Sequence, residues 1–95
     1  MLPPAYDQEG GPAIADAIRN ASPPSVLDVY YRDGDFMDGA TVNITMEGTV
    51  PEAEAFLCEV VDPIVRNGDP PEGLGVWVWD PNDEVLAVDW DTSCP

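Results

Sequence analysis

The longest regular hydrophobic pattern in this chain lies in residues 49–68, TVPEAEAFLCEVVDPIVRNG. Its apolar residues recur at intervals of three and four, which predicts a central helix with one buried face: Ala53, Phe56, Leu57, Val60, Val61, Ile64 and Val65. Thr49 and Glu52 have the spacing of a capping box at its start, and Gly68 stands where helices commonly end. Pro63 has no amide N–H to donate to residue 59, so we expect a kink or a break near the last turn.

A second, weaker helical pattern begins at Pro12 and is ended by Pro23 and Pro24. Its apolar stripe consists of Ile14, Ala17, Ile18 and Ala21. Residues 1–11 contain two pairs of helix and strand breakers, which favour an extended lead-in. We therefore expect a flexible lead-in over residues 1–11 and a single domain over residues 12–95.

Two strands are predicted between the helices, at residues 26–32 and 41–47. In both of them apolar and polar residues alternate, which is typical of strands with one buried and one polar face. The connection at residues 33–39 is rich in aspartate and glycine, as turns are. We expect these two strands to form a hairpin.

A second hairpin is predicted at residues 74–80 and 84–90, joined by a three-residue loop with Asp83 in the left-handed conformation. This loop would pair Val78 with Leu86, Val76 with Val88 and Leu74 with Trp90, so that all six side chains share one apolar face. The opposite face would then carry Trp77, Trp79, Val85, Ala87 and Asp89.

The predicted element order is α-β-β-α-β-β, which indicates an α+β two-layer sandwich. We expect a four-stranded, mainly antiparallel sheet with both helices on one face. The central helix would pack on inward-facing strand residues, namely Leu27, Val29, Val42, Ile44, Val76, Val78 and Leu86.

The net charge of −16, from nineteen acidic residues against three arginines, changes the functional picture. Such a charge repels nucleic acid and anionic membrane surfaces, so we expect no direct nucleic-acid binding. No apolar run approaches the roughly 18 residues of a membrane span, so we expect no membrane insertion. The acids are scattered rather than gathered in a tract, which favours a solvated acidic surface. The alternative is an acidic mimic of nucleic acid that inhibits a DNA-binding protein.

The chain offers little for catalysis, because it contains neither histidine nor lysine. It also lacks the short motifs of phosphate, dinucleotide and zinc-protease sites. The aspartates of residues 33–39 miss the spacing of a calcium loop by one position. We therefore expect no enzyme, no cofactor and no metal site.

Cys58 and Cys94 are the two cysteines of the chain. A disulfide between them would tie the C-terminal end to the central helix, and closing such a loop stabilises a fold by about 4 kcal/mol. A bridge favours a secreted or cell-surface protein. The first residues have neither the basic nor the apolar region of a signal peptide, so we expect none in this chain. The alternative is two free thiols in a cytoplasmic protein.

The predicted sheet face away from the helices carries an unusual set of aromatic and polar side chains. Its members are Trp77, Trp79, Tyr30, Asp28, Arg32, Asn43, Thr45 and Asp89. Exposed tryptophans rimmed by polar residues are typical of recognition surfaces. The alternative is that residues 33–39, the lead-in or a second copy of the chain covers these rings, since large aromatic side chains are seldom left bare.

These observations together predict a small, acidic, exported binding module that uses this sheet face. A protein is the favoured partner and a carbohydrate the second choice. A homodimer formed through the same face is a further candidate. The nucleic-acid mimic remains the alternative function.

Overall fold

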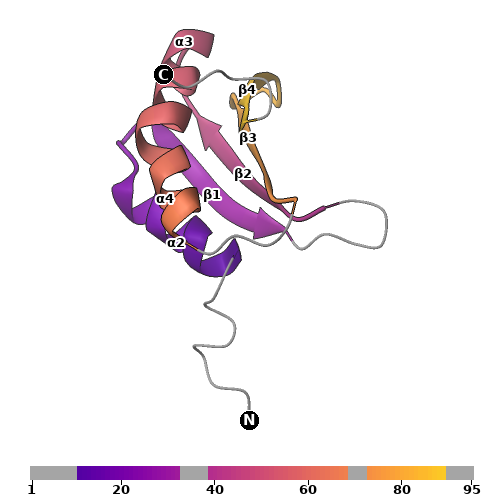
Figure 1. The fold of residues 1–95 in the computed structure, drawn as a ribbon. Coiled ribbons are helices and arrows are strands. Elements are labelled where there is room, and N and C mark those ends of the chain that lie inside the picture. The colour runs from indigo at the N-terminus through magenta and orange to yellow at the C-terminus, as the bar shows by residue number, and fades with distance from the viewer. Residues whose placement is uncertain (1–10, 33–38, 69–72, 90–95) are drawn as a thin grey trace.

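The computed structural model describes residues 11–32, 39–68 and 73–89 (Figure 1). Along the chain, its elements are α2 (Gly11–Ala21), β1 (Val26–Arg32), β2 (Thr41–Met46), α3 (Val50–Phe56), η1 (Leu57–Val61), α4 (Asp62–Asn67), β3 (Gly75–Trp79) and β4 (Val85–Val88). The segments α3, η1 and α4 follow one another without a break and form one long helix. The predicted lead-in lies outside the described residues, except for Gly11, with which α2 begins.

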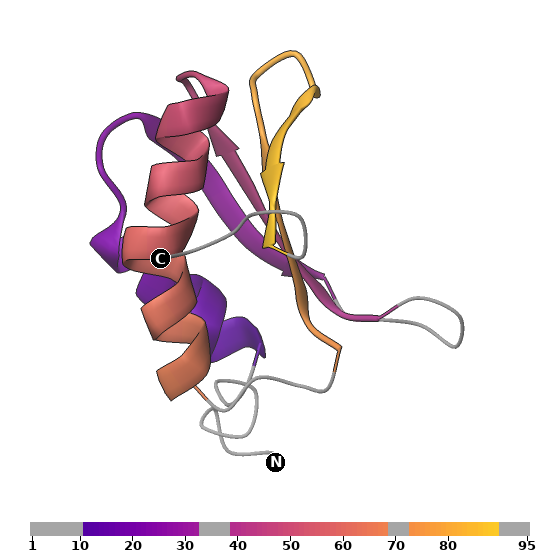
Figure 2. The ribbon, with the colours of Figure 1, turned by 45° about the horizontal axis from the view of Figure 1, so that its top comes forward.

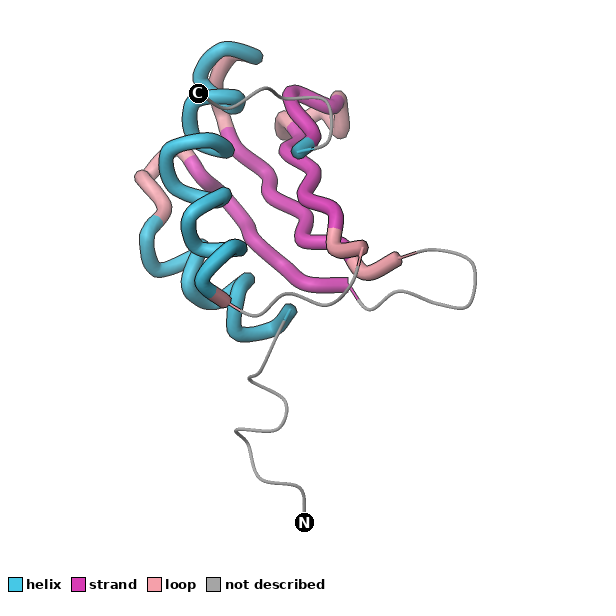
Figure 3. The backbone as a smooth tube through the Cα atoms, in the orientation of Figure 1, coloured by secondary structure: helices cyan, strands magenta, loops and turns pink. Residues whose placement is uncertain are grey.

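The four strands form one sheet in the order β1-β2-β3-β4 (Figure 3). The pairs β1/β2 and β3/β4 are antiparallel, as two hairpins require, but β2 and β3 run parallel. The fold is therefore α+β as predicted, whereas the expectation of a mainly antiparallel sheet is wrong, because the sheet is mixed. The long helix between β2 and β3 is a crossover connection that returns the chain to the same end of the sheet.

The buried side chains of the helices and of one sheet face form a single hydrophobic cluster. Its least exposed members are Ile14, Ile18, Ile44, Leu57, Val29, Val42, Val61, Val76 and Val78. Figure 2 shows α2 and the long helix next to each other beside the sheet. Fully burying a side chain of this kind contributes about 1.5–3 kcal/mol, so this cluster is the main source of stability.

The long helix begins and continues as its sequence dictates. The Thr49 hydroxyl accepts the N–H of Glu52, and the Glu52 carboxylate accepts the N–H of Thr49, which completes the predicted capping box. Pro63 does not break the helix. A π-helical turn precedes it, in which the N–H of Asp62 donates to the carbonyl of Leu57, and this wider turn accommodates the proline.

Two β-bulges change which residues face the core. In β1 the register shifts between Val26 and Asp28, so Leu27 is the extra residue and is 54% exposed instead of packing under the helix. In the second hairpin Asp83 has the predicted left-handed conformation, with φ of 66°. The register then shifts between Val78 and Trp79, which leaves Leu86 as the extra residue of β4.

The second bulge makes the predicted pairing of β3 with β4 wrong by one residue. Val78 lies opposite Ala87, and Trp77 lies opposite Val88. Ala87 is consequently buried in the core, while Val88 takes the position on the other face that Ala87 was expected to fill. The predicted pair of Leu74 with Trp90 includes a residue outside the described ranges.

Gly68 ends the long helix without adopting a left-handed conformation, since its φ is −100°. A methyl group added there would lie 2.6 Å from Cγ1 of Ile14 and 3.0 Å from the carbonyl oxygen of Ile64. Glycine is needed at this position because α2 and α4 approach each other closely.

We expect Gly68→Ala to lower the free energy of unfolding by about 1–3 kcal/mol, the usual cost of overpacking a core. Urea denaturation monitored by circular dichroism measures this change. Asn67→Ala is the matched control, because Asn67 is an exposed neighbour and its truncation should cost less than about 0.5 kcal/mol. Equal denaturation midpoints for the two variants would show that the contact with Ile14 is not tight.

β1 is an edge strand, and α2 protects part of it. The guanidinium of Arg19 donates to the backbone carbonyl of Val29 and also lies 2.5 Å from the carboxylate of Asp16. Covering the backbone groups of an edge strand prevents another chain from pairing with it. The sequence pattern contains no sign of this contact, because it depends on how α2 packs against β1.

We expect Arg19→Ala to increase self-association, because it frees an edge carbonyl of β1. Arg66→Ala is the control: it removes the same charge from an exposed ion pair with Asp62 on the long helix. Sedimentation velocity at several protein concentrations compares the two variants. If both remain equally monomeric, Arg19 does not protect this edge.

Candidate functional site

The sheet face that points away from the hydrophobic cluster carries ten described side chains, besides Gly75, and we call it the open sheet face. They are Asp28, Tyr30, Arg32, Thr41, Asn43, Thr45, Trp77, Trp79, Val85 and Val88. The strand pairing arranges them in rows across the sheet. One row runs from Asp28 through Thr45 and Trp79 to Val85, and the next from Tyr30 through Asn43 and Trp77 to Val88.

Two tryptophans form the centre of this face. The rings of Trp77 and Trp79 are stacked, with centroids 5.4 Å apart and planes 13° from parallel. The indole N–H of Trp79 donates to Oδ1 of Asn43 at 3.2 Å, and Nδ2 of Asn43 donates to the Thr41 hydroxyl at 3.0 Å. This chain of contacts holds the ring of Trp79 over β2, so hydrogen bonds within the domain orient the ring.

Asn43 is buried, unlike the other side chains of the open sheet face. It is only 9% exposed, although its neighbours on the open sheet face are accessible. A buried amide needs hydrogen-bond partners, and Trp79 and Thr41 supply them. Asn43 therefore positions the tryptophan from below and offers no contact surface of its own.

The structure brings most of the predicted binding residues together on this face. Besides Asn43, the predicted residues that lie there are Trp77, Trp79, Tyr30, Asp28, Arg32 and Thr45. Tyr30 on β1 is 48% exposed and Val85 on β4 is 44% exposed, so the two outer strands present apolar surface to solvent. Val88 and Thr41 complete the face. The sequence pattern did not place Val88 on this face, because it gives no sign of the bulge in β4.

Asp89 does not belong to the open sheet face, so its predicted location on that face is wrong. The register shift in β4 turns it toward the long helix, where it lines a small hollow with Leu57, Val61, Asp62, Val65 and Val76. The volume of this hollow is about 40 Å³, and Oδ1 of Asp89 is buried there with no hydrogen-bond partner among the described residues.

The charges around the open sheet face are unevenly distributed. Asp28 lies at the Trp79 end, and Glu47, Asp80 and Glu84 follow or flank the strands at that same end. The Asp80 carboxylate accepts the backbone N–H groups of Asn82 and Glu84 at 2.8 and 2.9 Å, which fixes its position. Arg32 lies at the opposite end of the face, where it pairs with Thr41 across the strands. Arg32 forms no ion pair with a described residue, unlike Arg19 and Arg66.

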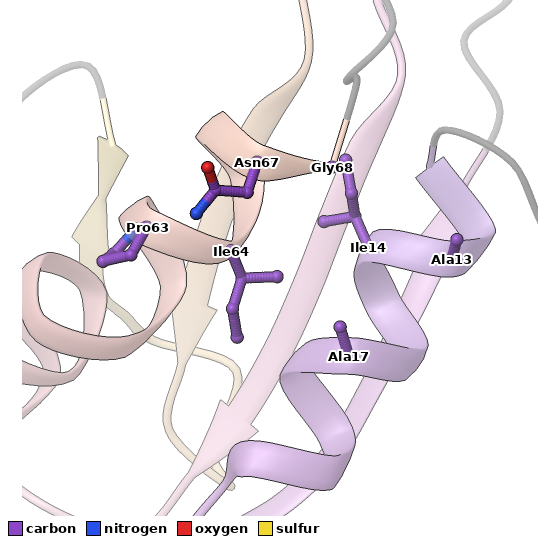
Figure 4. Close-up of a pocket in the computed structure, with 7 residues that line it drawn as sticks. All are labelled: Ala13, Ile14, Ala17, Pro63, Ile64, Asn67 and Gly68. Carbon is purple, nitrogen blue, oxygen red and sulfur yellow. The ribbon is translucent and has the colours of Figure 1, made fainter.

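A second hollow lies between α2 and α4, with a volume of about 330 Å³ (Figure 4). Figure 4 shows Ala13, Ile14 and Ala17 on the α2 side, and Pro63, Ile64, Asn67 and Gly68 on the α4 side. None of these lining residues is ionisable, so this groove has no group for acid–base or metal chemistry.

The described residues contain no group of three or more carboxylates or thiols placed to hold a metal ion. Within the same ranges, no helix has the length and apolar character needed to cross a membrane. The predicted calcium-like turn at residues 33–39 lies outside the description except for Gly39.

Cys58 lies half-buried in η1 and is not a free thiol. No disulfide joins two described residues, and Cys94 lies outside the described ranges. The Cys58–Cys94 bridge therefore stays a prediction.

No protein-family model, curated protein or solved structure matches this chain.

Proposed function

We propose that this protein is a small, exported binding module whose open sheet face binds a partner protein. The stacked, oriented pair of Trp77 and Trp79 carries this proposal. Tryptophan is among the residues most enriched at the energetic centres of protein interfaces, where it is surrounded by groups that exclude water. Val85 on the neighbouring strand β4, and Tyr30 on β1 beyond β2, add exposed apolar surface to the two sides of the tryptophans.

The stacking geometry favours a protein over a carbohydrate. The two indoles are nearly parallel and lie against each other, so each ring uses one of its broad faces for the other. They do not form one flat platform on which a sugar ring would stack. Ring edges and one remaining face suit the mixed apolar and polar surface of a protein.

Preorganisation also supports binding as the function of this face. A side chain held in place before association loses less conformational entropy when the partner arrives. The hydrogen bonds from Trp79 to Asn43 and from Asn43 to Thr41 provide this constraint at the cost of burying an amide.

The predicted disulfide and the acidic surface are the reasons for proposing export. A bridge from Cys58 would persist in an oxidising compartment. We propose no catalytic activity, because the described residues of the open sheet face lack a nucleophile paired with a base.

Affinity capture from the protein's own source tests the proposal. Three baits are compared: the wild-type domain, the Trp77→Ala/Trp79→Ala variant, and Val50→Ala, which truncates an apolar residue that is 45% exposed on α3. We expect a protein that the wild type and Val50→Ala retain and that the double variant loses. Equal capture by all three baits would contradict the assignment to this face.

A further inference from the structure

We infer that the partner presents a basic segment to the open sheet face and that one of its arginine side chains lies against Trp79. This inference rests on the proposed function and adds the chemistry of the partner.

Negative charge is concentrated at the Trp79 end of the open sheet face. At the Trp79 end, the ionisable residues described on the open sheet face and at the ends of the strands are all acidic: Asp28 on the face itself, with Glu47, Asp80 and Glu84 at the strand ends. Arg19 shares a hollow with Asp28 at the edge of β1, but its guanidinium is engaged by Asp16 and the carbonyl of Val29. Asp80 cannot turn away, because two backbone N–H groups hold its carboxylate. Complementary charge across an interface accelerates association and selects among partners.

The ring of Trp79 is oriented by two contacts within the domain. Its N–H is directed to Asn43, and one broad face lies against Trp77. An indole face is the best aromatic site for a cation, and arginine occupies such sites more often than lysine. The planar guanidinium can stack on the ring while it donates to a neighbouring carboxylate, which a lysine ammonium cannot do in the same geometry.

Charge disfavours a second copy of the chain as the partner of the open sheet face. Each copy carries a net charge of −16, so two acidic rims would meet in a symmetric dimer. The chain contains three arginines, and two of them already pair with Asp16 and Asp62. A basic partner removes this repulsion, whereas a second copy doubles it.

Calorimetric titration with two peptides tests the inference: an octa-arginine peptide and an octa-lysine peptide, both at about physiological ionic strength. We expect the arginine peptide to bind more tightly. Trp79→Ala should weaken its binding about fivefold, the size of a cation–π contact. Asp28→Asn should weaken it about two- to fivefold, the size of an exposed ion pair.

Glu54→Gln is the charge-matched control, because Glu54 is exposed on α3 and belongs to the helix layer. It removes the same unit of charge as Asp28→Asn but should leave the affinity unchanged. Equal losses from Asp28→Asn and Glu54→Gln, with no loss from Trp79→Ala, would mean that overall charge alone attracts the peptide, and would overturn the inference.

The capture experiment, repeated in the presence of the arginine peptide, separates failure of this inference from failure of the proposed function. If a captured protein depends on the two tryptophans but is not displaced by the arginine peptide, the partner is not basic and only the inference fails. A dimer that sedimentation detects in the wild type and not in Trp79→Ala would also overturn it, since the occupant would be a second copy. If no captured protein depends on the tryptophans, the proposed function itself fails.

Discussion

A domain carrying Trp79→Ala is expected to bind its partner protein about thirtyfold or more weakly while remaining folded. Truncating an interface tryptophan at an energetic centre typically costs about 2 kcal/mol or more of binding free energy. The ring of Trp79 lies on β3 of the open sheet face, in the row that runs from Asp28 through Thr45 to Val85. Its loss removes both the contact area and the stacking surface of Trp77.

The same substitution has a calculable cost for the fold. It removes the hydrogen bond to Asn43, which contributes about 1 kcal/mol, and a ring stack of about 0.5–1.5 kcal/mol. Small domains have total stabilities of about 5–15 kcal/mol, so the variant should remain folded. Water can reach Asn43 once the ring is gone and can replace the lost partner.

Trp79→Phe separates the two effects, because it keeps an aromatic ring and removes the indole N–H. We expect Trp79→Phe to retain more affinity for the partner than Trp79→Ala does. Both variants lose the hydrogen bond to Asn43, so both lose its contribution to stability. Calorimetry measures the affinity of each variant for the captured protein, and urea denaturation measures its stability. If Trp79→Ala is unfolded under native conditions, the ring is part of the core, and this result would contradict a binding role for Trp79.

Ile44→Ala is expected to lower the free energy of unfolding by about 2–5 kcal/mol, the largest change in stability that we predict. Ile44 is fully buried in β2, opposite Val29 on one side and Val78 on the other. Truncation leaves a cavity at the centre of the sheet, where the neighbouring strands cannot collapse without breaking their pairing. The lost transfer free energy and the cavity therefore add.

Thr45→Ala is the control for Ile44→Ala because it is the next residue of the same strand. Its side chain lies on the open sheet face and is half-buried, so we expect a loss of less than about 1 kcal/mol. Urea denaturation of both variants makes the comparison. Equal losses would mean that the two faces of β2 are buried to the same degree, contrary to the assignment of an open face.

The elements that could be predicted are those determined by local pattern. The helical stripe around Leu57 and the alternation around Ile44 depend only on the spacing of neighbouring residues. The capping box of Thr49 and the left-handed Asp83 follow from the chemistry of single positions. This is why the α+β class, and the location of most of the named residues on one sheet face, could be predicted.

The parts that were missed depend on contacts between distant segments. The parallel pairing of β2 with β3 follows from the long helix acting as a crossover, which the strand patterns alone do not reveal. The bulges at Leu27 and Leu86 shift the register by one residue, and a shift of one reverses the face of every residue beyond it. Asp89 was placed on the wrong face for this reason.

Some roles can be assigned only when partners are seen together. Gly68 has the position of a helix-ending residue in the sequence, yet its function is to admit the side chain of Ile14. Asn43 has the position of a surface residue on an alternating strand, yet it is buried beneath Trp79. Neither contact has a signature in local spacing.

Amide chemical-shift mapping by NMR tests the central claim most directly. The ¹⁵N-labelled domain is titrated with the protein that the wild-type bait captures, and the residues whose signals change are located on the structure. We predict changes centred on Tyr30, Thr45 and the indole N–H of Trp79. Changes confined to the helix layer, for example at Ala17 and Asn67 in the groove between α2 and α4, would contradict binding through the open sheet face.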